Sequence, residues 1–282
     1  MMKLGCLSLS YRPNFGDKRM DLERFIDTAY ELELDGVELH TSAFVSTDDA
    51  YLRDVRMRCL KRGLVLDYIA ISNNFGKAES ELPAEVENVK QWVDIAVKMG
   101  VPLVRIFAAW APEGTDETAA WGRMIGCMKE VAEYGEEKGV VIGLQNHNHG
   151  CLTRTGDDVV KIIKEVDNPY FSHILDTGQY VGSPGASGSR GKEDPALNFY
   201  SSIETSAPYA VHVRAKVYRI QTGEEVWLDY PRIFSILRKI GYNGFVSVVY
   251  EGWEVEDAET AVPKAVKYLR RCIQEVSYTI SP

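Results

Sequence analysis

The sequence predicts one closed (β/α)8 barrel that spans residues 1–282, and three observations support this fold class. Eight short apolar runs alternate with amphipathic stretches of helical spacing, which is the pattern of strand–helix repeats. No linker or change of composition interrupts the repeats, so a single domain is favoured over an open sheet with further domains. The chain is also longer than the roughly 250 residues that such a barrel needs.

The predicted strands are apolar runs that stop abruptly in polar residues, and they cover 3–10, 36–40, 64–72, 101–108, 140–146, 171–176, 210–217 and 245–251. The predicted helices each carry one apolar face, and they cover 21–33, 51–62, 83–99, 116–138, 158–166, 196–205, 231–240 and 260–275. Residues 178–195 form a long segment rich in Gly and Ser. A loop of this length inside a compact domain is usually a functional lid or a disordered segment, and we expect a lid over the carboxyl ends of the strands.

Composition excludes several classes of function. The net charge of −9 and the isoelectric point near 5.2 argue against a nucleic-acid partner, because backbone phosphates repel an acidic surface. The five cysteines are scattered and contain no CxxC pair, which indicates reduced thiols and a cytoplasmic protein. The apolar run near Met1 is too short for a signal peptide, so we expect none. The sequence has no window long enough to span a membrane, and neither a GxGxxG nor a Walker A motif.

Polar residues close two neighbouring strands of the predicted barrel. The fifth strand ends in Gln145, Asn146 and His147, and the sixth ends in Asp176 and Thr177. Ligands of parallel α/β folds bind at the carboxyl ends of the strands. We therefore expect these polar groups to contribute to one site.

Several segments resemble the xylose isomerase-like TIM-barrel superfamily of sugar isomerases, tagatose and psicose 3-epimerases, inosose dehydratases and apurinic endonucleases. The resemblance covers nearly the whole chain. It rests on ELDGVELH, KMGVPLVRIF, EEKGVVIGLQNHNHG, HILDTG, APYAVHVRAK and LDYPRIFSILRKIGYNGFVSVVYEG. These segments are specific for the fold and superfamily, and they say little about the substrate.

The resemblance implies a divalent metal bound by Glu, Asp, His and Glu at the ends of strands five to eight. At these four positions the chain has Gln145, Asp176, Arg214 and Val249, so three of the four ligands are replaced. An Arg side chain only donates hydrogen bonds and repels a cation. We therefore expect no metal and no other cofactor, and we hypothesise that Arg214 replaces the metal and pairs with Asp176.

The alternation of strand residues brings further candidates to the same side as Arg214. His212 and Lys216 share its side of strand seven, and Glu251 shares the side of Val249 on strand eight. The family ligands at these positions face inward, so we expect these side chains to face the barrel interior or its mouth. Lys216 and Glu251 are then either the acid and base of a proton transfer or a structural ion pair at the rim.

Polar residues at the ends of strands two and five have either a functional or a structural role. Glu38 and His40 end strand two, where relatives place a Glu near the substrate. Glu38 therefore either faces the substrate or is a buried carboxylate that is paired with a cation. His147 contacts the substrate or bonds to the backbone, and we expect the neighbouring His149 to be a loop residue.

The remaining candidates are an arginine, two aromatic residues and a histidine. Arg105 either binds a substrate carboxylate or phosphate or is a buried layer residue paired with a carboxylate. Trp110 and Tyr180 follow strands four and six, where aromatic faces stack on sugar rings, although exposed loop aromatics are common. His173 has the opposite parity to Asp176 and should face the helix layer.

Together these observations predict an enzyme of the sugar isomerase, epimerase or dehydratase kind that moves a proton next to a carbonyl. The expected acid–base groups are Glu251, Lys216, Glu38 and His147, and Arg214 would polarise the substrate oxygen. The expected substrate-binding residues are Asp176, Gln145, His212, His40, Arg105, Trp110 and Tyr180.

Two other functions stay open. The first is a catalytically silent carbohydrate-binding protein, in which lost ligands mean lost chemistry. The second, more remote, is an apurinic endonuclease, whose several metals need many more ligands than the five His residues of this acidic chain provide. The expected partner is a small carbohydrate, with no nucleic acid and no membrane, and a homodimer is left open.

Overall fold

The computed structural model describes residues 1–148, 150–186, 191–194 and 196–278. It contains a closed parallel barrel with strand order β1 to β8, which confirms the predicted fold class. The strands are β1 (Lys3–Leu7), β2 (Gly36–His40), β3 (Val65–Ala70), β4 (Leu103–Ile106), β5 (Val141–Gln145), β6 (Phe171–Asp176), β7 (Ala210–Val217) and β8 (Phe245–Tyr250). The α-helices are α1 (Arg12–Gly16), α2 (Leu22–Glu31), α3 (Asp49–Arg62), α4 (Leu82–Met99), α5 (Glu117–Lys138), α6 (Gly156–Val166), α7 (Phe199–Ser206), α8 (Tyr230–Lys239) and α9 (Ala258–Tyr278).

The chain divides into two compact units. The first combines Met1–Asp67 with His212–Pro282, and the second is Tyr68–Val211. The boundaries fall inside β3 and β7, so Asp67 and His212 both belong to the first unit. No helix in the described ranges combines the length and apolar character that crossing a membrane requires.

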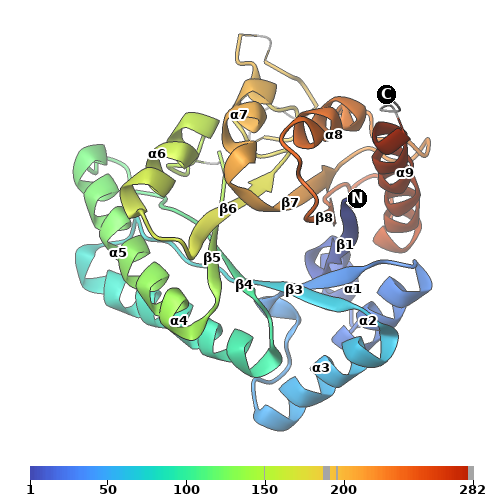
Figure 1. Ribbon diagram of the computed structural model, residues 1–282, viewed down its shortest axis with the longest axis horizontal. Helices are drawn as coiled ribbons and strands as arrows, with labels where there is room; N and C mark the ends of the chain where they lie inside the picture. The colour runs from blue at the N-terminus through green and yellow to red at the C-terminus, as the bar shows by residue number, and fades with distance from the viewer. Residues whose placement is uncertain (149, 187–190, 195, 279–282) are drawn as a thin grey trace. The chain divides into compact units, whose positions relative to one another are not determined.

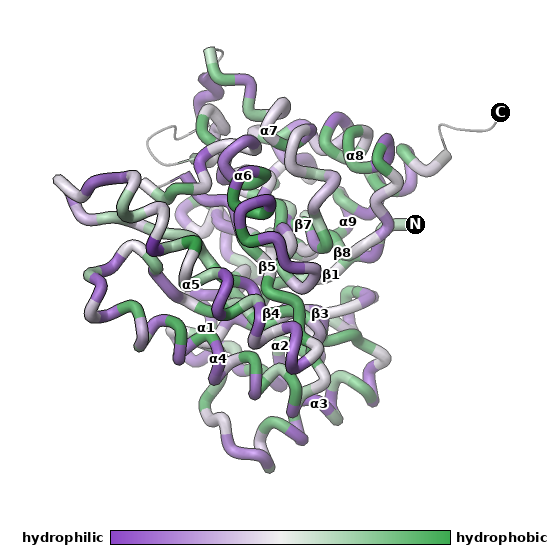
Figure 2. The backbone as a smooth tube through the Cα atoms, turned by 60° about the vertical axis from the view of Figure 1, so that its left-hand side comes forward, coloured by the Kyte–Doolittle hydropathy of each residue, from purple (hydrophilic) through white to green (hydrophobic). Residues whose placement is uncertain are grey.

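The first unit holds β1, β2, β8 and most of β7. In register, Leu7 of β1 lies opposite Glu38 of β2, and Arg214 of β7 lies opposite Ser247 of β8. The helices of this unit are amphipathic. In Figure 2 the tube of α3 alternates between hydrophilic and hydrophobic colours, and the helix buries Leu52, Val55 and Cys59. Burial of one apolar face holds such a helix against the strands.

The second unit holds β4, β5, β6 and most of β3, with helices α4 to α7. Figure 1 shows α4, α5 and α6 on the outer side of these strands. Helix α6 begins with a reciprocal capping box between Thr155 and Asp158. Helix α5 ends at Gly139, whose φ of 72° is a left-handed conformation that glycine adopts at low cost.

The first strand is shorter than expected. We predicted strand residues 3–10, but β1 ends at Leu7 and a 3-10 helix covers Ser8–Tyr11. The hydroxyl of Ser10 donates to the carbonyl of Val248 at 3.0 Å and accepts from the amide of Tyr250 at 3.1 Å. The Ser10 side chain therefore makes the hydrogen bonds to the β8 backbone that the backbone of a longer β1 would have made.

The predicted lid at residues 178–195 lies partly outside the described residues, which omit 187–190 and 195. The described part turns tightly, with hydrogen bonds from the Ser183 amide to the Tyr180 carbonyl and from the Ala186 amide to the Ser183 carbonyl. Whether the loop acts as a lid stays a prediction.

Candidate functional site

Lys216 and Glu251 form an ion pair at the carboxyl ends of β7 and β8. The Lys216 Nζ lies 2.5 Å from the Glu251 Oε1, and the two side chains are 3% and 26% exposed. The Glu251 amide donates to the carbonyl of Val217 at 2.9 Å, and the hydroxyl of Tyr230 donates to the carbonyl of Lys216. The backbone at both ends of the pair is therefore fixed, while the carboxylate of Glu251 keeps contact with solvent.

Arg214 lies one alternation below Lys216 on the same side of β7. Its side chain is 2% exposed, which is rare for an arginine, and it is opposite Ser247 in the β7–β8 register. Its charge acts on the pKa of Glu38, which it lowers against the opposing effect of burial. The strand thus places a buried positive charge next to the ion pair of Lys216 and Glu251.

His212 lies one alternation further along β7 and belongs to a buried polar cluster. Its Nδ1 contacts the carboxylate of Asp67 on β3, and its Nε2 lies 2.9 Å from the Ser247 hydroxyl. The Oε1 of Glu38 lies 4.0 Å from the same Nε2. Barrel interiors are usually filled by branched apolar side chains, so this polar layer is unusual.

Glu38 is the least satisfied member of this cluster. Its side chain is fully buried, and neither carboxyl oxygen has a hydrogen-bond partner among the described residues. Burial raises the pKa of this carboxyl well above its usual value, the charge of Asp67 adds to the rise, and the charge of Arg214 opposes it. The expected buried carboxylate is present, but no cation among the described residues donates a hydrogen bond to it.

His40 follows Glu38 on β2 and has a structural contact. Its Nδ1 accepts a hydrogen bond from the Ser42 amide at 3.2 Å and lies 2.8 Å from the Ser42 hydroxyl, so it caps the short 3-10 helix that follows. A role of His40 in substrate binding stays a prediction.

In the second unit, Gln145 and Asp176 form a hydrogen-bonded pair at the ends of β5 and β6. The Gln145 amide donates to Oδ2 of Asp176 at 2.9 Å, and the Gly178 amide donates to Oδ1 at 3.1 Å. Asn146 holds the backbone of Asp176 from both sides, because it donates to the carbonyl at 3.0 Å and accepts from the amide at 2.7 Å. Both oxygens of Asp176 therefore accept hydrogen bonds from its own unit.

These contacts do not fit the metal that the four family positions imply. Gln145 directs a donor, not an oxygen, at the Asp176 carboxylate. Arg214 is a cation, and Val249 is a fully buried apolar residue without a ligand atom. Asp176 and Arg214 belong to different units, and their pairing stays a prediction.

An aromatic cluster lies where β4 and β5 end. Phe107 packs edge-on against Trp110 and His147, with ring centroids 5.0 and 5.4 Å apart, and Trp110 and His147 are also 5.4 Å apart. Trp110 and His147 are both half-buried, and each ring therefore keeps some surface for a ligand. A sugar ring offers C–H faces that pack on such aromatic surfaces.

Arg105 lies under this cluster as a buried layer residue. It is 1% exposed, its Nη1 donates to the carbonyl of Ile71 at 2.7 Å, and its guanidinium lies 4.0 Å from the centre of the Phe107 ring. It therefore supports the aromatic cluster from below. Binding of a substrate anion by Arg105 is not supported by this placement.

Tyr180 was expected to stack on a sugar, and the structure corrects this. Its side chain is fully buried, and its hydroxyl lies 3.1 Å from His173 Nε2 and 2.5 Å from the Ser206 hydroxyl on α7. His173 faces the helix layer, as its parity predicted, and burial lowers its pKa from 6.5 to about 4. Both residues are part of the core, and His149 lies outside the described residues.

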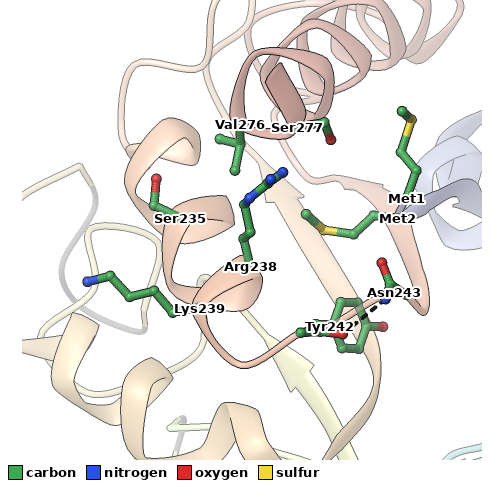
Figure 3. A pocket seen from close by; sticks show the side chains of 10 residues that line it. Met1, Met2, Ser235, Arg238, Lys239, Tyr242, Asn243, Val276 and Ser277 are labelled. Carbon is green, nitrogen blue, oxygen red and sulfur yellow. Dashed lines mark hydrogen bonds between the residues drawn. The ribbon is translucent and has the colours of Figure 1, made fainter. Parts of the chain in front are cut away.

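A cavity of about 820 Å³ lies at the opposite end of the strands in the first unit. Met1 and Met2 precede β1 and Tyr242 and Asn243 precede β8, and Figure 3 shows these side chains around the same opening as Arg238. Active sites of this fold form at the carboxyl ends of the strands. This cavity is therefore separate from the ion pair of Lys216 and Glu251.

Two residues that organise these groups were not expected from the sequence. Asp67 and Ser247 hold His212, whereas Asn146, which positions Asp176, was among the polar residues expected at the end of strand five. Asp67 is a single acid in an otherwise apolar strand, and this pattern indicates a buried polar contact. Ser247 has no such signal, because a serine in a strand is common.

Comparison with known proteins shows the family of this chain. The xylose isomerase-like TIM barrel family matches residues 26–272. The C-glycoside deglycosidase alpha subunit of Microbacterium trichothecenolyticum is 22% identical over 88% of this chain and 83% of its own length.

Solved structures show the same fold at low identity. The D-psicose 3-epimerase of Clostridium cellulolyticum H10, solved with D-tagatose, superposes with a TM-score of 0.74, 17% identity and full coverage of both chains. The 3-keto-D-glucoside 4-epimerase of E. coli has a TM-score of 0.73 at 16% identity and covers 96% of this chain and 100% of its own. Because the family match spans most of the sequence, this chain belongs to the xylose isomerase-like TIM barrel family.

Proposed function

We propose that this protein is a sugar or sugar-derivative isomerase or epimerase that moves a proton on a carbon next to a carbonyl. The observation that carries the proposal is the ion pair of Lys216 and Glu251, which places a partly exposed carboxylate and a cation at the carboxyl ends of two barrel strands. Relatives named as sugar epimerases share the fold, and they support the choice of a carbohydrate substrate.

The chemistry assigns one role to each charged side chain. The Glu251 carboxylate takes the proton from the carbon next to the carbonyl, and the electron pair of that C–H bond forms an enolate. The positive charges of Lys216 and Arg214 stabilise the enolate oxygen, as fixed charges do in a site of low polarity. Return of the proton from the Glu251 carboxyl to the neighbouring carbon gives the isomer. Delivery of a proton from solvent to the opposite face gives the epimer, and Glu251 then releases its proton to solvent. No step uses a metal.

Taken by itself, the aromatic cluster of the second unit is a candidate surface for a sugar ring. Trp110 and His147 offer half-buried rings, and Arg105 fixes Phe107 beneath them. Gln145 and Asp176 would add hydrogen bonds to sugar hydroxyls. Loss of a stacking ring should raise KM more than it lowers kcat, because stacking is already present in the ground state.

The test is exchange of carbon-bound hydrogen with solvent. The protein is incubated in D2O with D-psicose, D-tagatose, a 3-keto-glucoside or a C-glycoside, the compounds that the names of the relatives suggest. We expect deuterium at the carbon next to the carbonyl in at least one of them, with a loss of roughly 10²–10⁴-fold in Glu251→Gln. Glu254→Gln is the matched control, since Glu254 is 60% exposed and pairs with Arg219.

Two results would count against the proposal. Equal exchange by wild type and Glu251→Gln would remove Glu251 as the base. Sugar binding by the wild type without any exchange would favour the catalytically silent carbohydrate-binding protein instead.

A further inference from the structure

We propose that Glu38, Asp67 and His212 form a binding site for one divalent transition-metal ion, at a place other than the four family positions. The three side chains come from β2, β3 and β7 and all belong to the first unit. Each offers one ligand atom, and these atoms lie within 4.8 Å of one another. The inference does not depend on the proposed function, because it uses neither Lys216 nor Glu251.

The distances suit a shared ion better than direct contact. The Nε2 of His212 and the Oε1 of Glu38 are 4.0 Å apart, too far for a hydrogen bond. Two ligands at about 2.1 Å from a tetrahedral ion stand about 3.4 Å apart, so a closure of roughly half an ångström is enough.

Asp67 orients the imidazole of His212 so that its Nε2 can bind a metal ion. Its carboxylate contacts Nδ1, which places the ring proton there and leaves the lone pair of Nε2 directed toward the Ser247 hydroxyl and Glu38. A carboxylate behind the second ring nitrogen is a recurring feature of histidine ligands to metals. Asp67 thus acts from behind the ring, as the carboxylate partner of the histidine ligand.

Glu38 is the independent observation that points to a ligand. It is fully buried, and neither of its oxygens has a hydrogen-bond partner in the part of the chain that the structure describes. A buried carboxylate needs either a proton or a cation, and the charge of Arg214 offsets only part of the effect that burial has on Glu38. A dication would neutralise Glu38 and Asp67 together and would bond to the unpartnered oxygens.

The backbone beside Glu38 leaves room for its carboxylate. A Cβ atom on Gly5 would lie 2.3 Å from the Glu38 Oε1, so only glycine permits this side-chain position. Asp67 is 15% exposed and gives the otherwise buried cluster a route to solvent. Tyr242 lines the cavity of Figure 3. Burial raises the pKa of its hydroxyl, and the charges of Asp67 and Glu38 add to the rise.

The donor set favours a transition metal over Mg²⁺ or Ca²⁺. One imidazole nitrogen and the Glu38 carboxylate, with Asp67 behind the imidazole, suit Zn²⁺, Mn²⁺ or Co²⁺, whereas the alkaline-earth ions prefer all-oxygen sites. The arrangement of Asp67, His212 and Ser247 also resembles a nucleophilic triad. Ser247 is fully buried, however, so its hydroxyl has no access to a substrate.

The test compares metal affinity in variants that keep the size of each side chain. Wild-type protein, stripped with a chelator, is titrated with Zn²⁺ and with Co²⁺, whose visible absorption reports the ligand geometry. We expect about one ion per chain, a loss of affinity of at least ~100-fold in Glu38→Gln and His212→Gln, and a loss of about 10–100-fold in Asp67→Asn. Ser247→Ala, which removes only the competing hydroxyl, should bind as well as wild type.

Asp176→Asn distinguishes this site from the family position. It should leave metal affinity unchanged, whereas a site at the end of β6 would lose its ion. X-ray absorption of the wild-type Zn²⁺ complex should show a nitrogen and oxygen shell with imidazole scattering. This measurement tests the proposal even if the variants do not fold.

Three outcomes would overturn the proposal. They are no binding of Zn²⁺, Mn²⁺ or Co²⁺ by the wild type, unchanged affinity in Glu38→Gln, and loss of the ion only in Asp176→Asn. If the wild type binds no metal and Glu38→Gln has the same thermal stability as the wild type, Glu38 carries a proton instead of binding an ion.

Discussion

The side-chain amide of Gln145 donates a hydrogen bond to the carboxylate of Asp176 at 2.9 Å. Both side chains are buried, with exposures of 1% and 0%. This pair occupies two of the positions at which the family pattern has metal-binding carboxylates. A neutral donor is therefore used where relatives have a second negative charge.

Gln145→Glu should destabilise the protein when no metal is added. The new carboxylate would face Asp176 without a proton or donor between them, and buried like charges repel strongly. We expect a loss of about 2 kcal/mol or more in the free energy of unfolding, measured with urea. Gln91→Glu is the control, because Gln91 lies on the exposed side of α4 beside Glu87 and should cost less than about 0.5 kcal/mol.

Gly5→Ala should destabilise the first unit through Glu38. The added Cβ would lie 2.3 Å from the Glu38 Oε1, a distance that forces the carboxyl or the strand to move. We expect a loss of about 1–3 kcal/mol, which the double variant with Glu38→Ala should recover in part.

Gly122→Ala is the matched control for this substitution. Gly122 lies inside α5, and no atom lies within 4 Å of an added Cβ. Alanine should stabilise that helix by up to about 1 kcal/mol. Equal effects of the two substitutions would show that the space beside Glu38 is unimportant.

His173 should make stability fall with acid. Its pKa is about 4 in the folded protein and 6.5 in a solvated chain, so the unfolded state binds the proton more readily between these values. The stability that the neutral His173 contributes is fully present above pH 6.5 and is lost as the pH falls toward 4. The resulting change in the free energy of unfolding is roughly 3 kcal/mol.

The measurement is the free energy of unfolding of wild type and His173→Gln from pH 7 to pH 4. The difference between the two proteins should shrink over this range, because only the wild type must keep His173 neutral. His40→Gln provides the control, since His40 is only half-buried. Parallel curves for wild type and His173→Gln would contradict the prediction.

Tyr180→Phe should affect stability and not sugar binding. The substitution removes the hydroxyl between His173 and Ser206 and leaves buried polar groups unpaired, at a cost of about 1–3 kcal/mol. Tyr30→Phe is the control, because Tyr30 is 53% exposed. A change in sugar affinity with unchanged stability would restore Tyr180 as a stacking residue.

The sequence was sufficient for the barrel because its signals are local. Each strand and helix has its own period, and the predicted ranges contain all eight barrel strands. The end of β1 was wrong because the hydroxyl of Ser10 bonds to β8, a contact between residues that lie far apart in the chain. Periodicity within one segment contains no information about such contacts.

The candidate site was only partly predictable. The positions of Lys216, Glu251 and Arg214 followed from the family pattern and strand parity, and the ion pair of Lys216 and Glu251 is present. Tyr180 was misplaced, because its position after β6 did not reveal the hydrogen bond that draws it into the core. Asp67 was not singled out, because a lone acid in a strand does not reveal a contact with His212, which lies far along the chain.

The division of the chain has a consequence for synthesis on the ribosome. The second unit is continuous and is complete when Val211 has been made, whereas the first unit needs Met1–Asp67 together with the last seventy or so residues. Strand β1 pairs with β8, and the hydroxyl of Ser10 bonds to the backbone at Val248 and Tyr250. Strand β1 therefore cannot complete its pairing until β8 has been made, and Glu38 and Asp67 meet His212 only after the whole second unit has left the ribosome.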